Sequence, residues 1–194
     1  GLFGVIVISC ALFSYELSAG AENEKQSSAA SLKKADALFK DQHWAEARDA
    51  YDKIRDQEKD WHSPAMRQAV QGAVACLLKL QLWDDALRRA EQFVEKTRGS
   101  FEEAIGERYL GGLKMVVPHW GTKRGSTLLR GQHTQGVYVT TWRKDRREAI
   151  QHYERARDLL IALSGKFGTE GNPDTPERRR LIEVGRVHGP VPEI

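Results

Sequence analysis

The sequence has little excess charge, little cysteine and only one long apolar run. Its 30 basic and 27 acidic residues leave a formal net charge of +3, which is too small for the whole chain to predict a polyanionic partner. A nucleic-acid partner is therefore not expected. The two cysteines are Cys10 and Cys76, and the second lies within the apolar run AVACLLKL. If the N-terminal segment is removed, the remaining thiol cannot form an internal disulfide, and we expect it to be a buried core residue.

The sequence also lacks the short motifs of common catalytic sites. It contains no G-x-S-x-G nucleophile elbow and no G-x-x-x-x-G-K-[ST] phosphate loop. The acidic pairs Asp84-Asp85 and Glu102-Glu103 lie at expected helix starts, where carboxylates complement the helix dipole. The spacing of three histidines matches no compact metal site: His119, His133 and His152. We therefore expect no enzymatic activity, no cofactor and no metal, and the function expected is binding.

The N-terminal residues have the composition of a secretory signal peptide. The chain begins with Gly1 and not with methionine, so the natural start is expected to lie further upstream. Residues 2–13, LFGVIVISCALF, are apolar, and Ala19-Gly20-Ala21 suits a signal peptidase. A signal peptide over residues 1–21 and a flexible leader over 22–30 predict a secreted or periplasmic protein of the bacterial envelope. A buried strand or helix is the alternative, since no basic segment precedes the run.

A membrane-spanning helix is not expected after the signal is removed. Glu16 interrupts the apolar stretch, which is shorter than the roughly 20 apolar residues that a bilayer requires. Whether Cys10 is a lipidation site stays open.

Between residues 31 and 96, apolar residues recur at spacings of three and four, as on one face of an amphipathic helix. One helix is expected to begin at Ser31, and Ser63-Pro64 supplies a capping side chain and a first-turn proline for another. The run that begins at Trp83 repeats the pattern of the run at Trp44, 39 residues earlier. The matching positions are Trp44, Ala47, Tyr51 and Ile54, and then Trp83, Ala86, Ala90 and Phe93.

A third helical pair is expected, but its two helices are far apart in the sequence. Ser100 and Glu103 form the S-x-x-E pattern of a capping box at the start of the first helix. Pro118 ends that helix, and the apolar pattern of the second occurs only in KDRREAIQHYERARDLL, residues 144–160. The sequence therefore predicts an all-α domain over residues 31–164, with an insertion at residues 117–143.

The helical pattern resembles the tetratricopeptide repeat (TPR) family. In that family the second helix of each unit opens with an aromatic residue, followed by a small residue and a second aromatic at fixed spacing. Trp44, Ala47 and Tyr51 match these positions, and Ala149 and Tyr153 supply the last two in the third pair. The resemblance implies a solenoid of three TPR-like hairpins whose groove binds a protein or peptide partner. The residues expected to face the groove are Gln68, Gln71, Lys79, Glu103 and Glu107.

The insertion is expected to contain a short strand. Its glycines, Gly121, Gly125, Gly131 and Gly136, exclude one continuous helix. The alternation in VYVTTW, residues 137–142, predicts a strand, with residues 126–130 as the hypothetical pairing partner.

The same region is strongly basic. Between Lys123 and Arg147 seven basic residues accompany one acid, Asp145. Arginines among glycine turns suit a phosphate or carboxylate, so the alternative function is recognition of an anionic ligand, an acidic polymer or phosphate. The residues expected to bind it are Arg124, Arg130, Arg143 and Arg147. A purely structural interpretation, in which these arginines bridge to helices carrying Glu102, Glu103 and Glu107, stays open.

Residues 100–160 also resemble the N-terminal helical-repeat region of large secreted bacterial alpha-2-macroglobulin-like proteins. The similarity lies in PHWG, in RGQHTQGVYV and in the amphipathic helix that follows. It implies that the chain is the front of a longer envelope protein, with residues 165–194 as a linker or the start of a following domain. Because the chain has no thioester motif and no bait region, only the location and a binding role carry over.

Overall fold

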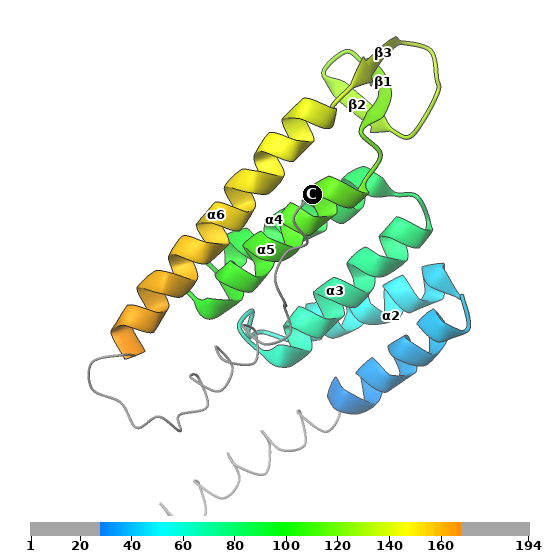
Figure 1. The fold of residues 1–194 in the computed structure, drawn as a ribbon. Coiled ribbons are helices and arrows are strands. Elements are labelled where there is room, and N and C mark those ends of the chain that lie inside the picture. The colour runs from blue at the N-terminus through cyan, green and yellow to red at the C-terminus, as the bar shows by residue number, and fades with distance from the viewer. Residues whose placement is uncertain (1–27, 168–194) are drawn as a thin grey trace, which may run out of the picture. The chain divides into compact units, whose positions relative to one another are not determined.

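The computed structural model describes residues 28–167, which form two compact units, one ending at Ala86 and the other starting at Leu87. The expected signal peptide 1–21, most of the leader 22–30 and most of segment 165–194 lie outside the described residues. The described chain is mostly helical, as the sequence predicts. Its elements are a helix at 28–40, α2 (Trp44–Gln57), α3 (Pro64–Lys79), α4 (Trp83–Lys96), α5 (Phe101–Val116), β1 (Trp120–Arg124), β2 (Thr127–Arg130), β3 (Val137–Thr140) and α6 (Trp142–Phe167) (Figure 1).

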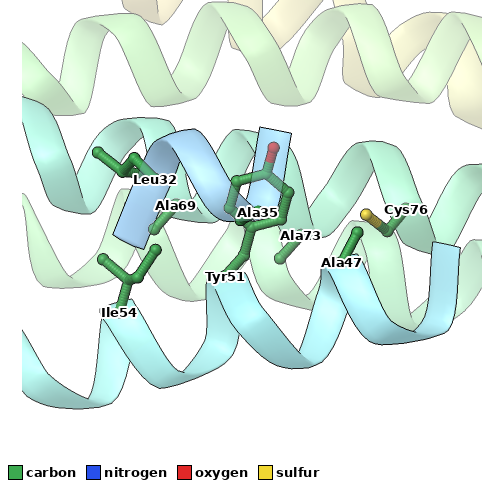
Figure 2. Packing of buried hydrophobic residues seen from close by; sticks show 8 residues of the cluster. All are labelled: Leu32, Ala35, Ala47, Tyr51, Ile54, Ala69, Ala73 and Cys76. Carbon is green, nitrogen blue, oxygen red and sulfur yellow. The ribbon is translucent and has the colours of Figure 1, made fainter. Parts of the chain in front are cut away.

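The first unit packs helix 28–40, α2 and α3 around small side chains. Figure 2 shows eight residues of this core: Leu32, Ala35, Ala47, Tyr51, Ile54, Ala69, Ala73 and Cys76. The start of α3 is as expected, because the Ser63 hydroxyl accepts the Met66 N–H at 3.0 Å and Pro64 occupies the first turn. Cys76 is fully buried, and burial raises the pKa of its thiol to about 11. The expectation of a buried cysteine is confirmed.

Tyr51 joins the three helices of the first unit. Its hydroxyl donates to Asp36 Oδ1 at 2.5 Å, which links α2 to helix 28–40. Its ring lies against α3 at Gly72, where an added Cβ would be only 2.4 Å from the ring. Position 72 must therefore be a glycine for the hydroxyl end of the tyrosine ring to pack against α3.

The second unit begins with a capped turn between α4 and α5. Ser100 accepts the Glu103 N–H at 3.3 Å, as the capping box predicts, but the Glu103 carboxylate accepts the N–H of Gly99 at 2.6 Å and not that of Ser100. The approach of α5 to α4 is close at Gly106, where an added Cβ would be 2.9 Å from Val94.

The two helices of the expected third hairpin, α5 and α6, lie side by side although 25 residues separate them (Figure 1). They approach closely at Gly111, where an added Cβ would be 3.1 Å from the Ala149 carbonyl oxygen. Buried Lys114 lies 2.9 Å from Glu148 of α6 and 3.5 Å from Glu91 of α4. The sequence therefore placed the second helix of the pair correctly.

The insertion folds as a three-stranded antiparallel sheet, in the order β2-β1-β3, at the end of the hairpin where α5 and α6 are connected (Figure 1). The strand expected within residues 137–142 is present over Val137–Thr140. Its expected partner was wrong, because β3 pairs with β1 and not with residues 126–130. A tight turn at Gly125, whose φ is +61°, joins β1 to β2, so β2 takes one edge of β1. Residues 131–136 then return the chain to the other edge.

Candidate functional site

A buried ion pair holds the sheet to the start of α6. Arg130, at the end of β2, meets Asp145 in the first turn of α6 through two parallel contacts of 2.8 Å. Asp145 also accepts from the Thr141 hydroxyl at 2.5 Å and lies 3.0 Å from His119 Nδ1. Arg130 is 6% exposed and Asp145 is 0% exposed. We call Arg130, Asp145, Thr141 and His119 the anchor.

The anchor compensates for the cost of burying a charge. Burial by itself would raise the pKa of Asp145, but hydrogen bonds from Arg130, Thr141 and His119 and the charge of Arg130 outweigh it. They lower the pKa of this carboxyl from its ordinary 3.8 to about 2. A forked guanidinium suits this role because both of its contacts form in one plane.

The depressed pKa of Asp145 predicts an acid-sensitive fold. Because the folded carboxyl has the lower pKa, its stabilisation is complete above the unfolded value of 3.8 and is lost as the pH falls toward about 2. We expect protonation of Asp145 to lower the free energy of unfolding by about 2 kcal/mol as the pH falls from about 5 to about 2. Urea unfolding at several pH values measures it. Over this pH range, the free energy of unfolding of Asp145→Asn should fall by about 2 kcal/mol less than that of the unchanged protein. Equal decreases in the two proteins would contradict the assignment.

Residues 131–136 are fixed against the sheet. The Thr122 hydroxyl donates to the Gln132 carbonyl at 2.8 Å and accepts the Thr134 N–H at 3.2 Å. Gly136, with φ +147°, passes so close to β1 that an added Cβ would be 2.6 Å from the Lys123 carbonyl oxygen. These contacts hold the segment over one face of β1.

Three aromatic rings gather on that same face. His133 stacks on Trp120 at a centroid distance of 4.7 Å and lies nearly parallel to Tyr138 at 5.7 Å. Tyr138 nonetheless remains 59% exposed. At the base of the sheet, Trp142 meets the His119 ring edge-on at 4.5 Å and is 44% exposed. The surface of the insertion therefore combines fixed backbone with exposed aromatic area.

The exposed charge of the insertion and the adjoining start of α6 is entirely positive. The only acid within residues 117–147 is Asp145, which is buried in the anchor. Among the exposed cations of this segment, Lys144 pairs with Glu148 at 3.7 Å. The others have no carboxylate partner within residues 28–167. We call these unpaired side chains the free cations: Lys123, Arg124, Arg143, Arg146 and Arg147.

The free cations fall into two groups at opposite ends of β3. Lys123 pairs with Val137 in the sheet, so Lys123 and Arg124 lie beside the start of β3. Arg143, Arg146 and Arg147 follow its end, in the first turns of α6. A strand of four residues spans about 13 Å, so the groups flank the strand instead of forming one cluster.

Of the four arginines expected to bind an anion, three are exposed and one is not. Arg124, Arg143 and Arg147 belong to the free cations. Arg130 was expected to bind an external anion, but it is buried and pairs with Asp145 of this chain. The structural interpretation named Glu102, Glu103 and Glu107, and it is wrong for Glu103 and Glu107, whose carboxylates pair with Arg155 and His152 of α6.

Glu103 and Glu107 are buried between α5 and α6 and do not face an open groove. Arg155 Nη2 lies 2.6 Å from Glu103, and its Nε lies 2.9 Å from Glu107. His152 Nδ1 lies 2.6 Å from Glu107. The exposed fractions of the two glutamates are 2% and 4%. The two glutamates were expected to face the groove, but α6 packs across this face of α5 and supplies their partners, Arg155 and His152.

The other three residues that were expected to face the groove lie on α3 in the first unit. Gln68 is exposed and its amide donates to Asp36 Oδ2 at 3.2 Å. Lys79 is exposed, with its ammonium 5.7 Å from the centre of the Trp44 ring. Gln71 is half-buried. These three residues belong to the first unit, whereas Glu103 and Glu107 belong to the second.

Sequence reasoning missed the anchor and the aromatic cluster. One signal for the anchor was present, because a single acid among seven bases is a natural internal partner for one of them. No comparable signal pointed to the cluster, since His133 comes from a segment without periodicity. Among the described residues no group of histidine, cysteine or acidic side chains could hold a metal ion. In the same part of the chain, every helix is too short or too polar to cross a membrane.

The chain was compared with models of protein families, with curated proteins and with solved structures, and none of the three comparisons finds a match.

Proposed function

We propose that this chain is an exported protein-interaction module of the TPR type, and that it forms the N-terminal part of a larger alpha-2-macroglobulin-like protein of the bacterial envelope. The paired helices α5 and α6, with a glycine–alanine contact at Gly111 and Ala149, support the helical-hairpin part of the proposal. A solenoid built from such hairpins buries one face of each helix and leaves polar residues such as Gln68 for binding.

The observation that carries the proposal is the anchored insertion with its free cations. A buried ion pair, a fixed segment and an aromatic cluster hold a small sheet whose exposed charge is all of one sign. The backbone of such a surface loses little conformational entropy on binding, which leaves more of the contact energy as affinity. The partner that fits is a protein surface rich in carboxylates, because guanidinium groups bind carboxylates in a fixed geometry.

Photo-cross-linking in the producing bacterium tests the interaction. Benzoylphenylalanine is placed at Arg124 in the insertion, at Gln68 on α3 and at Arg98, an exposed arginine in the turn between α4 and α5 that serves as the control. We expect protein adducts at position 124 and none at 98. Adducts at 68 alone would move the contact to the helical groove, and no adduct at 124 or 68 would contradict a protein-interaction role.

The second candidate is recognition of an acidic polymer or phosphate by Arg124, Arg143 and Arg147. It is favoured by the absence of carboxylate partners for these side chains among residues 28–167. It predicts affinity for polyphosphate that falls steeply with ionic strength, because each neutralised phosphate releases counterions. The triple variant Arg124→Glu, Arg143→Glu, Arg147→Glu should abolish that binding, and reversal of the half-buried Arg48 and of the exposed Arg98 and Arg157 should not.

Export has its own test. Cleavage after Ala21 predicts that the mature protein begins at Glu22. N-terminal sequencing of protein from the envelope fraction checks this, and a protein that retains residues 2–13 would contradict the signal peptide.

A further inference from the structure

The edge of β3 is open in the described part of the chain. In the order β2-β1-β3 this strand pairs on one side with β1, and no strand within residues 28–167 pairs with its other side. Val137 is 68% exposed and Tyr138 is 59% exposed. The strand, VYVT, has high β-propensity and contains no charge and no proline. Soluble proteins normally protect an edge strand with charge, proline or a bulge, so an edge without them suits pairing with another chain.

The direction of the unused backbone groups follows from the register. Thr141 N–H donates to the His119 carbonyl at 2.6 Å, and Thr140 lies opposite Trp120. Because N–H groups alternate between the two sides of an antiparallel strand, the N–H groups of Thr140 and Tyr138 point away from β1. These groups can pair with an added strand.

The edge is also held in place. Thr140 Oγ1 donates to the His119 carbonyl at 3.1 Å, and Thr141 belongs to the anchor. Tyr138 rests in the aromatic cluster. The opposite edge is less open, because β2 has Leu128 and Leu129 half-buried and ends in buried Arg130. A strand would therefore add at β3.

The charges beside the edge select the added strand. Lys123 and Arg124 lie beside the start of β3, and Arg143, Arg146 and Arg147 follow its end. If β3 of a second copy of this chain paired antiparallel with this β3, the cations at the start of each strand would lie beside the cations at the end of the other. Like charges so placed repel. An extended segment with carboxylates at both ends and β-branched residues between them satisfies both the edge and the cations.

We propose that β3 accepts an extended acidic segment of a partner protein as a fourth strand. Backbone hydrogen bonds to Tyr138 and Thr140 supply its attachment, and the free cations at the two ends of the strand set its register. This inference rests on the proposed protein-interaction function and specifies its contact.

The test uses the full chain and a fluorescein-labelled peptide of about ten residues, DETVTVTVED, with binding followed by fluorescence anisotropy. Thr140→Pro removes an outward N–H while the contacts of Val139 with β1 remain. Thr140→Val, which keeps that N–H, is the matched control. We expect Thr140→Pro to weaken binding about tenfold and Thr140→Val to leave it within about twofold. Arg124→Glu with Arg143→Glu should weaken it at least about tenfold. Circular dichroism and urea unfolding confirm that each variant is folded.

Equal affinity of Thr140→Pro and Thr140→Val for the peptide would overturn the inference, because charge alone would then explain binding. Dimerisation of the free chain that Thr140→Pro abolishes would also overturn it, by assigning the edge to a second copy. No saturable binding of the peptide, while protein adducts still form at position 124, would overturn the inference and leave the proposed function in place. The absence of protein adducts at both 124 and 68 would instead count against the function itself.

Discussion

Replacing Asp145 with alanine is expected to destabilise the second unit by about 3–5 kcal/mol. The change leaves the guanidinium of Arg130, which is 6% exposed, without its counter-charge, and it removes the acceptor of Thr141 and His119. An uncompensated buried charge costs more than the intact pair contributes, so the effect should exceed that of an ordinary surface substitution several-fold. Urea unfolding followed by circular dichroism and by tryptophan fluorescence measures it, since Trp120 and Trp142 lie beside the anchor.

The control for this prediction is Asp158→Ala in the same helix. Asp158 has a side chain that is 64% exposed and pairs only with its neighbour Arg157 in the ion pairs of the described chain. Exposed pairs of this kind contribute little, so the change should remain within about 0.5 kcal/mol. Similar small effects for both substitutions would show that Arg130 and Asp145 are not buried against one another.

The second large effect is expected at Gly111. A leucine there should destabilise the protein by about 2–3 kcal/mol, because its side chain has to enter a close contact between α5 and α6. Even the Cβ would lie 3.1 Å from the Ala149 carbonyl oxygen and 3.2 Å from the Tyr153 ring. Thermal or urea unfolding of Gly111→Leu provides the measurement.

The adjacent glycine supplies a matched control. A Cβ at Gly112 would meet only the Tyr153 hydroxyl at 3.7 Å, which is an ordinary contact. Gly112→Ala should therefore stabilise α5 by about 0.5–1 kcal/mol, the usual gain of alanine over glycine within a helix. Gly111→Ala should lack this gain. If the two alanine substitutions stabilise the protein equally, the helices do not meet at Gly111.

The helices could be predicted from the sequence because their signals are local. The spacing of Ala47, Tyr51 and Ile54 already defines the buried face of α2, and Ser63 and Ser100 mark helix starts by their own side chains. The return of the α6 pattern at Ala149 was sufficient to pair that helix with α5 across the insertion.

The sheet could be predicted only in part. β3 alternates β-branched and aromatic residues, but β1, WGTKR, has a glycine and two cations and shows no strand pattern. The strand order depends on the turn at Gly125 and on the return of residues 131–136, and neither leaves a periodic signal. The partners of Arg130, Glu103 and Glu107 could not be predicted either, because they depend on which helix or strand lies nearby in the tertiary structure.

The close contacts of α5 with its neighbouring helices also depend on tertiary structure. Gly106 of α5 approaches α4 at Val94. The glycine that meets Ala149 is Gly111, five residues further along α5. Both positions require a small residue, Gly106 because α5 approaches α4 there and Gly111 because α5 approaches α6 there.

The account depends most on the claim that Arg130 and Asp145 join the inserted sheet to the helical hairpin. A double-mutant cycle with Arg130→Met, Asp145→Leu and the double variant measures that coupling directly. The account predicts that each single variant is strongly destabilised and that the double variant recovers at least about 2 kcal/mol relative to the sum of the two, because it contains no unpaired buried charge. Additive effects, with a coupling energy near zero, would contradict it.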